Sequence, residues 1–412
     1  MPSIPAEQVS EKTDRVEGNP YLLPFILVTS LFFLWGLANI LNSTLIAHFQ
    51  PVFTISRAEA MFVETAFYFG YFTIAIPAGL FMEKYSYKKG ILMGLVLYAV
   101  GALLFIPAAK LLAFGFFLVA LFIIASGLAF LETGANPYVM LLGKQETATV
   151  RLNFAQSFNG VALVVGPWVA GQFIFAGNEG ELATLQEKQQ AAEAVIIPYA
   201  GIATIVLFVS LLFFLTRMPE PDKGSGLHFD KTIFKRSHLL LAVIAQFLYV
   251  GAQVGIWGIT IDFVTKLLPG TSREIASKYY LLGGSFLFVS GRFFGTWLMR
   301  KIRDHKMLTA YGFAAMFLCL MGAFTEGALA VYSLIGINFF MSIMFPTIFA
   351  LGVQDLGDNT KLGSSLLIMS IVGGALLPPI MALFPLQYSL FVPMLAFAFV
   401  SFFGWKGYRV RT

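Results

Sequence analysis

The chain has 412 residues, of which 58% are hydrophobic and only 12% charged, with a formal net charge of +5. A soluble protein carries about 25% charged residues, so this composition excludes an ordinary soluble domain and is typical of a polytopic helical membrane protein. The positive charges lie in short loops between apolar segments, which gives no indication of a nucleic-acid partner, and the single Cys319 excludes an intramolecular disulfide.

A membrane-spanning helix needs about 20 mostly apolar residues. By this criterion the sequence predicts twelve spans, near residues 22–48, 58–81, 90–109, 112–142, 152–176, 194–217, 239–266, 274–299, 307–326, 328–354, 362–384 and 386–406. We therefore expect an all-α protein with twelve transmembrane helices, embedded in the lipid bilayer of the cell (inner) membrane as a monomer.

The distribution of lysine and arginine predicts the orientation of these spans. One set of loops and tails holds twenty of these residues and the opposite set holds six, so the positive-inside rule places both termini in the cytosol. The Pro- and Gly-containing segment after span 6 divides the spans into two sets of six. The expected divisions are a cytosolic N-terminal tail (1–20), an N-terminal half (21–217), a cytosolic linker (218–238), a C-terminal half (239–406) and a cytosolic C-terminal tail (407–412).

Span 1 carries a polar stripe. Trp35, Asn39 and Asn42 are spaced i, i+4, i+7 and share one helix face, and Ser43 follows directly. An amide both donates and accepts hydrogen bonds, which matches the vicinal hydroxyls of a sugar, while an aromatic ring packs against its apolar face. We expect these four residues to contact a substrate.

Span 2 carries Glu64 near its external end. This residue is either a vestibule or gate charge or a residue of proton coupling. The stretch from Gly79 to Lys89 follows, with an acid at Glu83 and basic residues that include Lys88 and Lys89. It resembles the loop motif of the major facilitator superfamily, in which a charge latch closes the cytosolic side. Topological anchoring by the basic residues is the alternative, and we favour the latch.

Span 4 contains Glu132 at its middle, with Asn136 one turn further along the same face. An acid at the centre of a bilayer costs roughly +2.5 to +3.5 kcal/mol even by the lower estimates, so such residues are usually functional. Burial favours the neutral form of a carboxyl group. A carboxyl that is neutral when enclosed and exchanges its proton when reached by water would couple transport to a proton gradient.

Further polar residues lie in the spans that follow. Span 5 provides Gln156 and Asn159, and span 7 provides Gln253 and Trp257 on one stripe. Such amides often only join helices to one another, but stripes on four spans at overlapping depth favour a lined substrate cavity. Arg292 in span 8 is expected to be a cytosolic-side gate or a packing residue.

Assembled, these residues resemble the L-fucose/proton symporter family of sugar permeases over roughly residues 22 to 406. The segments that carry the resemblance are 32–42, 66–72, 131–138, 151–159, 249–257, 345–352 and 371–375. It implies a major facilitator fold in two six-helix halves and import of a neutral monosaccharide, such as L-fucose or a related hexose, driven by a cation. It also implies an essential acid on span 4, matched by Glu132, and amides on spans 1 and 5, matched by Asn39, Asn42, Gln156 and Asn159.

One departure bears on the coupling ion. The fucose permeases have an aspartate where this chain has Ser43. If that aspartate relays protons, then either the relay is shortened in this chain or Glu64 takes over its role. The Ser43 hydroxyl could instead help to bind Na+. We expect proton coupling, with Na+ coupling as the alternative.

A proton-driven drug or metabolite antiporter is a second hypothesis, supported by Gly166-Pro167, which is reminiscent of exporters. That pair can also simply allow spans 5 and 8 to pack closely. The sequence has no phosphate-binding loop and no catalytic constellation. We therefore expect a transporter, not an enzyme, without a cofactor or a metal site.

Overall fold

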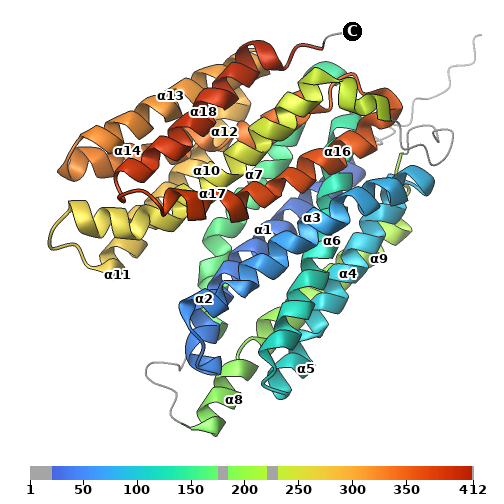
Figure 1. The fold of residues 1–412 in the computed structure, drawn as a ribbon. Coiled ribbons are helices and arrows are strands. Elements are labelled where there is room, and N and C mark those ends of the chain that lie inside the picture. The colour runs from blue at the N-terminus through green and yellow to red at the C-terminus, as the bar shows by residue number, and fades with distance from the viewer. Residues whose placement is uncertain (1–20, 175–183, 220–230, 411–412) are drawn as a thin grey trace, which may run out of the picture.

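The structure is a computed structural model that describes residues 21–174, 184–219 and 231–410. Within these ranges every regular element is a helix, and Figure 1 shows the helices as two side-by-side groups. The predicted N-terminal tail, most of the predicted linker and the last two residues lie outside the described residues.

The first group, here called the N-terminal half, is formed by elements up to α9. Its elements are α1 (Leu22–Phe53), α2 (Arg57–Ala60), α3 (Phe62–Lys84), α4 (Tyr87–Leu103), α5 (Phe105–Lys110), α6 (Phe114–Leu141), η1 (Gln145–Thr147), α7 (Ala148–Val169), η2 (Ala170–Ile174), α8 (Leu185–Glu193) and α9 (Ile196–Leu215).

The second group, the C-terminal half, is formed by the remaining elements. They are η3 (Lys231–Lys235), α10 (Ser237–Leu267), α11 (Arg273–Ile275), η4 (Ala276–Leu281), α12 (Leu282–Leu298), α13 (Asp304–Phe324), α14 (Gly327–Met341), α15 (Met344–Gly352), η5 (Gly357–Asn359), α16 (Thr360–Met369), η6 (Ser370–Val372), α17 (Gly373–Met381), η7 (Tyr388–Leu390), α18 (Phe391–Phe402) and η8 (Phe403–Gly407).

Eleven helical segments of the described residues are long and apolar enough to cross a membrane. The remaining predicted span, 274–299, is the continuous run of α11, η4 and α12, in which a π-helical turn precedes an α-helix of only 17 residues. The predicted all-α, twelve-span architecture is confirmed.

Small residues allow the helices to approach closely. A Cβ atom added to Gly94 of α4 would lie 2.8 Å from the Gly127 carbonyl oxygen of α6. Gly166 of α7 faces Ile40 of α1, whereas Gly160 is the residue that faces Val289 of α12. The interpretation that Gly166 lets spans 5 and 8 pack is therefore wrong in detail, because that glycine serves the contact with span 1.

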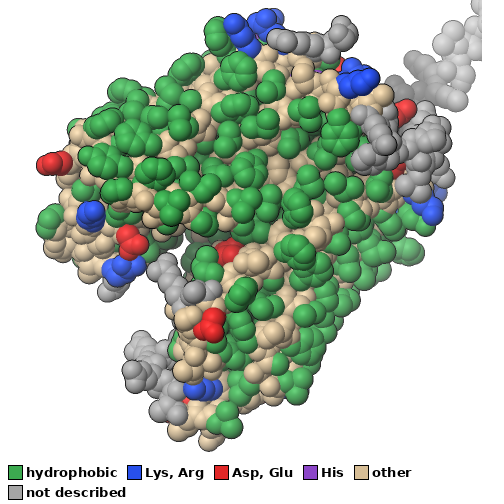
Figure 2. All heavy atoms as spheres, in the orientation of Figure 1, with side chains coloured by type: hydrophobic (Ala, Val, Ile, Leu, Met, Phe, Trp, Pro, Cys, Tyr) green, Lys and Arg blue, Asp and Glu red, His purple; other side chains and the backbone are tan. Residues whose placement is uncertain are grey.

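The bundle has two unlike ends. At the linker end, where α9 ends and α10 begins, the two halves are in contact through α3 with α16 and through α7 with α12 and α15. At the opposite end, the α8 end, which carries α2, α8 and α11, the surface is hollowed between the halves (Figure 2). The protein is thus closed at the linker end and has a cleft at the α8 end.

Candidate functional site

Glu132 lies within α6 and is buried inside the helix bundle. Its side chain is only 2% exposed. Oε1 accepts a hydrogen bond of 2.5 Å from the hydroxyl of Tyr71 on α3, while Oε2 is buried without a hydrogen-bond partner. A buried carboxyl with one unsatisfied oxygen is costly unless it carries a proton or gains a ligand.

A chain of amides extends from Glu132 toward the C-terminal half. Asn136 donates through Nδ2 to the Glu132 backbone carbonyl at 2.9 Å. Gln156 of α7 donates through Nε2 to Asn136 Oδ1 at 2.8 Å. Arg292 of α12 then donates through Nη1 to the Gln156 carbonyl at 2.8 Å. These bonds bring three predicted site residues of the N-terminal half together with the predicted gate residue of the other half.

Arg292 also donates a hydrogen bond to the backbone where the helix of the tenth span is broken. Proline has no N–H group, so Pro346 leaves the carbonyl of Ser342, four residues earlier, without its usual helical donor. The helix breaks there between α14 and α15. Arg292 donates through Nε to that carbonyl at 2.6 Å, and the hydroxyl of Tyr249 donates to the neighbouring Met341 carbonyl at 3.0 Å. Unwound backbone at membrane depth is tolerated when protein groups satisfy it in this way.

The predicted stripe of span 1 divides into a closed and an open part. The Trp35 ring lies 6.0 Å from that of Phe345 across the two halves. Asn42 is 1% exposed, and neither of its amide atoms has a hydrogen-bond partner. Asn39 and, on α7, Asn159 keep partial exposure.

The predicted stripe of span 7 is likewise only partly buried. Gln253 and Trp257 of α10 are both half-buried. The Trp257 indole donates through Nε1 to Asn338 Oδ1 of α14 at 2.8 Å, which fixes the indole ring. Polar and aromatic side chains from α1, α7 and α10 therefore remain partly accessible at mid-span.

Ser43 and Glu64 meet nearer the α8 end. The Ser43 hydroxyl of α1 donates to Glu64 Oε1 of α3 at 3.0 Å. Ser43 is exposed and Glu64 half-buried, so water can reach this pair from the hollowed end of the molecule.

The predicted gate residues of the loop motif take different positions. Glu83 pairs with Lys361 of α16 at 3.6 Å across the two halves. Lys88, in contrast, donates to the Phe214 and Thr216 carbonyls at 2.9 and 2.8 Å, at the end of α9 in its own half. Lys89 lies 5.6 Å from the Tyr85 ring centre, also within its half.

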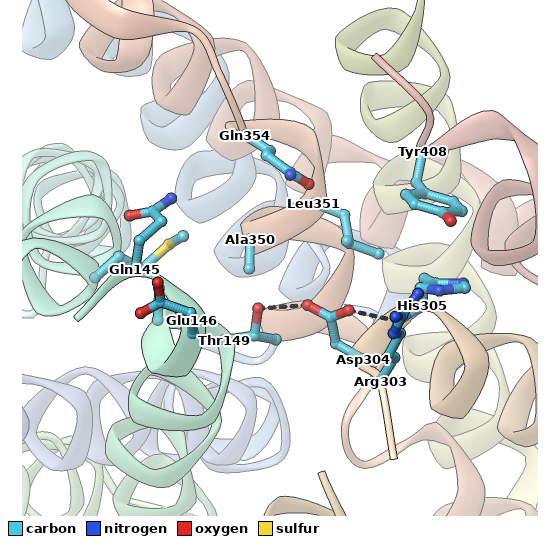
Figure 3. Close-up of a pocket in the computed structure, with 12 residues that line it drawn as sticks. Gln145, Glu146, Thr149, Arg303, Asp304, His305, Ala350, Leu351, Gln354 and Tyr408 are labelled. Carbon is cyan, nitrogen blue, oxygen red and sulfur yellow. Dashed lines mark hydrogen bonds between the residues drawn. The ribbon is translucent and has the colours of Figure 1, made fainter. Parts of the chain in front are cut away.

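A separate cavity of about 350 Å³ lies at the linker end, away from Glu132. Figure 3 shows Thr149 of α7 donating to Asp304 of α13 there, at 2.7 Å, beside the stacked rings of His305 and Tyr408. The contact joins the two halves. None of the predicted substrate-binding residues lines this cavity.

Several residues of the site were not predicted. Tyr71, the donor to Glu132, reads in the sequence as one more aromatic residue of an apolar span, and Asn338 is a single amide without a stripe. Lys361 is the lysine at the beginning of the eleventh span, and its pairing with Glu83 depends on how the halves meet. Only the spacing of Tyr68 and Tyr71 relative to Glu64, i+4 and i+7 on one face, carried a usable signal.

Comparisons with known proteins agree with this geometry. The family model described as Major Facilitator Superfamily matches residues 25–379. The chain is 41% identical to an L-fucose-proton symporter of Escherichia coli over 95% of this chain and 94% of that protein. It is 35% identical to a glucose/galactose transporter of Brucella abortus, over 96% of each.

A solved structure has the same arrangement of helices. The crystal structure of the major facilitator transporter FucP in the outward conformation superposes with a TM-score of 0.85 at 39% identity, over 95% of this chain and all of that one. The chain belongs to the major facilitator superfamily, and within it to the family of the L-fucose–proton symporters.

Proposed function

We propose that this protein imports a neutral hexose or 6-deoxyhexose, such as L-fucose, together with a proton by alternating access. The observation that carries the proposal is the Glu132 carboxyl, which is buried, accepts a hydrogen bond from Tyr71 and has one unpartnered oxygen. The relatives described as L-fucose-proton symporters and glucose/galactose transporters support the substrate class.

The charge state of Glu132 sets the order of events. A protonated carboxyl can be enclosed at little cost, whereas a carboxylate without a second partner resists enclosure. Sugar and proton bound together therefore allow the halves to close over the site and open at the other end. Release of the proton to the cytosol restores the charge, and Tyr71 supplies one hydrogen bond to the carboxylate during the return.

The substrate would lie against the partly accessible residues of the cleft. Asn39, Asn159 and Gln253 offer donors and acceptors for hydroxyl groups, and Trp35 and Trp257 offer aromatic faces. Asn42, Asn136 and Gln156 are buried next to this site, and Ser43 is exposed. A sugar bound close to Glu132 couples its transport to that of the proton. Each of the two solutes changes the free energy needed to close the halves around the other.

The linker end acts as the cytosolic gate in this proposal. The positive-inside rule places it in the cytosol, so the described conformation is open to the outside. Opening inward requires separation of Glu83 from Lys361 and of Arg292 from the Gln156 carbonyl. Lys88 and Lys89 support this gate indirectly, by fixing the end of α3, the start of α4 and the end of α9.

Uptake by purified protein in liposomes tests the function. L-fucose, D-galactose and D-glucose are offered under an inward proton gradient, an inward Na+ gradient, or neither. We expect accumulation of at least one hexose under the proton gradient and its loss with a protonophore. Accumulation that follows Na+ alone, or no uptake of any sugar, would contradict the proposal. A hydrophobic cation such as tetraphenylphosphonium should not be exchanged for protons.

A further inference from the structure

Asn338 is a buried amide on α14, a helix that contacts both α10 and α12 within the C-terminal half. Its side chain is only 2% exposed. Oδ1 accepts the indole N–H of Trp257 on α10 at 2.8 Å. Nδ2 donates to the Ile335 backbone carbonyl, one turn earlier on α14, at 3.1 Å. Asn338 thus ties the ring of a predicted substrate-binding residue to the backbone of a neighbouring helix.

The two hydrogen bonds fix which way the Asn338 amide faces. An amide carries N–H donors on one atom and an acceptor on the other, whereas an indole offers only a donor. If the amide were turned over, its NH₂ group would face the indole N–H and its oxygen would face the Ile335 carbonyl, so both bonds would be lost. Asn338 therefore presents an acceptor to Trp257.

The Trp257 ring has a second contact, with Phe288 of α12. The two ring centres are 5.5 Å apart and the ring planes meet at 75°, which is an arrangement that aromatic pairs favour. Phe288 is itself 2% exposed, and the Arg292 guanidinium lies 4.5 Å from its ring centre. The indole of Trp257 is thus held by both α12 and α14.

These contacts all lie within the C-terminal half, so movement of the halves relative to each other does not require them to break. The half-buried Trp257 therefore keeps its ring in one position while the halves rock. An indole has a single N–H donor, and Asn338 occupies it. What Trp257 offers to a sugar is the carbon face of the ring, which packs against the apolar C–H side of a pyranose.

We propose that Asn338 is a positioning residue for the sugar and acts through Trp257. By accepting the indole N–H, it holds the ring ready for the substrate before the substrate binds. A group that is already fixed loses less conformational freedom on binding. Loss of this acceptor therefore weakens sugar binding without slowing the movement of the halves. The inference rests on the sugar transport proposed above.

Initial rates of uptake into liposomes over a range of sugar concentrations test this role. The probe is L-fucose, or D-galactose or D-glucose if the wild type accumulates one of these instead. Asn338→Leu keeps a side chain of similar size and removes the acceptor. It should raise KM by about tenfold, the scale of one lost hydrogen bond. Vmax should stay within about twofold of wild type, because a loss of binding that is equal in the ground and transition states changes only KM.

A buried hydroxyl on the same helix provides the matched control. Ser333 is 4% exposed, and its hydroxyl donates to the Leu329 carbonyl of its own helix at 2.7 Å. Ser333→Ala should therefore leave both KM and Vmax at the wild-type values. A rise in KM as large as that of Asn338→Leu would show that any change in this helix has the same effect, and would overturn the inference.

A second pair of variants displaces the amide without removing it. A Cβ atom added to Gly284 of α12 would lie 3.0 Å from Asn338 Nδ2 and 3.3 Å from its Cγ atom, which is closer than an ordinary contact. At the preceding Gly283, nothing lies within 4 Å of such an atom. Gly284→Ala should raise KM in the same direction as Asn338→Leu, whereas Gly283→Ala should not.

Combination with Trp257→Phe provides the decisive arm. Phenylalanine has no N–H group, so Asn338 has no donor to hold in this background. Trp257→Phe alone should raise KM, and adding Asn338→Leu should raise it no further. A purely structural role of Asn338 would instead add its own defect. An unchanged KM in either single variant, or additive effects in the double variant, would overturn the inference while wild-type sugar transport stands. Absence of sugar transport by the wild type would overturn the proposed function, and the inference with it.

Discussion

Arg292 donates to the backbone carbonyl of Gln156 at 2.8 Å, and this bond joins the two halves. The guanidinium has its second anchor within its own half, at the Ser342 carbonyl. The planar guanidinium of arginine holds several N–H donors in fixed directions, so Arg292 can bind both carbonyls at once. The ammonium group of a lysine is a single point charge and cannot replace this geometry. Arg292 thus connects the interruption of the tenth span to closure at the linker end.

Arg292→Lys should therefore favour opening at the linker end. A hydrogen bond from a charged group is worth about 1.5–3 kcal/mol, which corresponds to roughly a tenfold to hundredfold change in the equilibrium between open and closed forms. The readout is labelling by an impermeant maleimide of a cysteine at Ala350, which is 3% exposed. The buried Cys319 is first replaced by serine. Equal labelling in both backgrounds would remove Arg292 from the gate.

Loss of the Glu83–Lys361 pair should also favour opening at the linker end, with a smaller effect than loss of the Arg292 bond. Both side chains are about 15% exposed, and such pairs contribute up to about 1 kcal/mol. Glu83→Gln should raise the same labelling severalfold. The charge exchange Glu83→Lys with Lys361→Glu should bring it back toward wild type. If the exchange behaves like the sum of its single variants, the two residues do not interact.

Tyr71→Phe should separate coupled uptake from exchange. The phenol is a donor to Glu132, and its loss makes the ionised carboxyl harder to enclose during the return of the empty carrier. We expect accumulation to slow by about tenfold, since bonds to charged groups are worth about 1.5–3 kcal/mol. Exchange uses only the loaded carrier and should persist. Equal loss of both activities would indicate a purely structural role.

Close helix packing gives a prediction for stability. Gly94→Ala places a Cβ atom 2.8 Å from the Gly127 carbonyl oxygen, and overpacking of this kind costs about 1–3 kcal/mol. We expect a lower melting temperature in detergent. Gly115→Ala is the matched control, since nothing lies within 4 Å of a Cβ atom there. A similar melting temperature for both variants would contradict the packing argument.

The sequence predicted what depends on local composition and helical period. The number of spans, the buried acid at Glu132 and the shared faces of Asn39 with Asn42 follow from hydropathy and spacing. What it could not predict depends on how distant helices meet. Lys361 opposite Glu83, Arg292 at the carbonyl freed by Pro346, and Lys88 at the end of α9 are contacts between segments far apart in the chain. Glu64 is intermediate, because its partner Ser43 was noted but their contact was not.

The measurement that tests the account most directly is sugar accumulation by Glu132→Gln in liposomes under an inward proton gradient, with exchange measured in parallel. The amide keeps the shape and neutrality of the protonated acid but cannot release a proton. The account predicts that accumulation above the external sugar concentration is lost while exchange continues. Undiminished accumulation by this variant would contradict it.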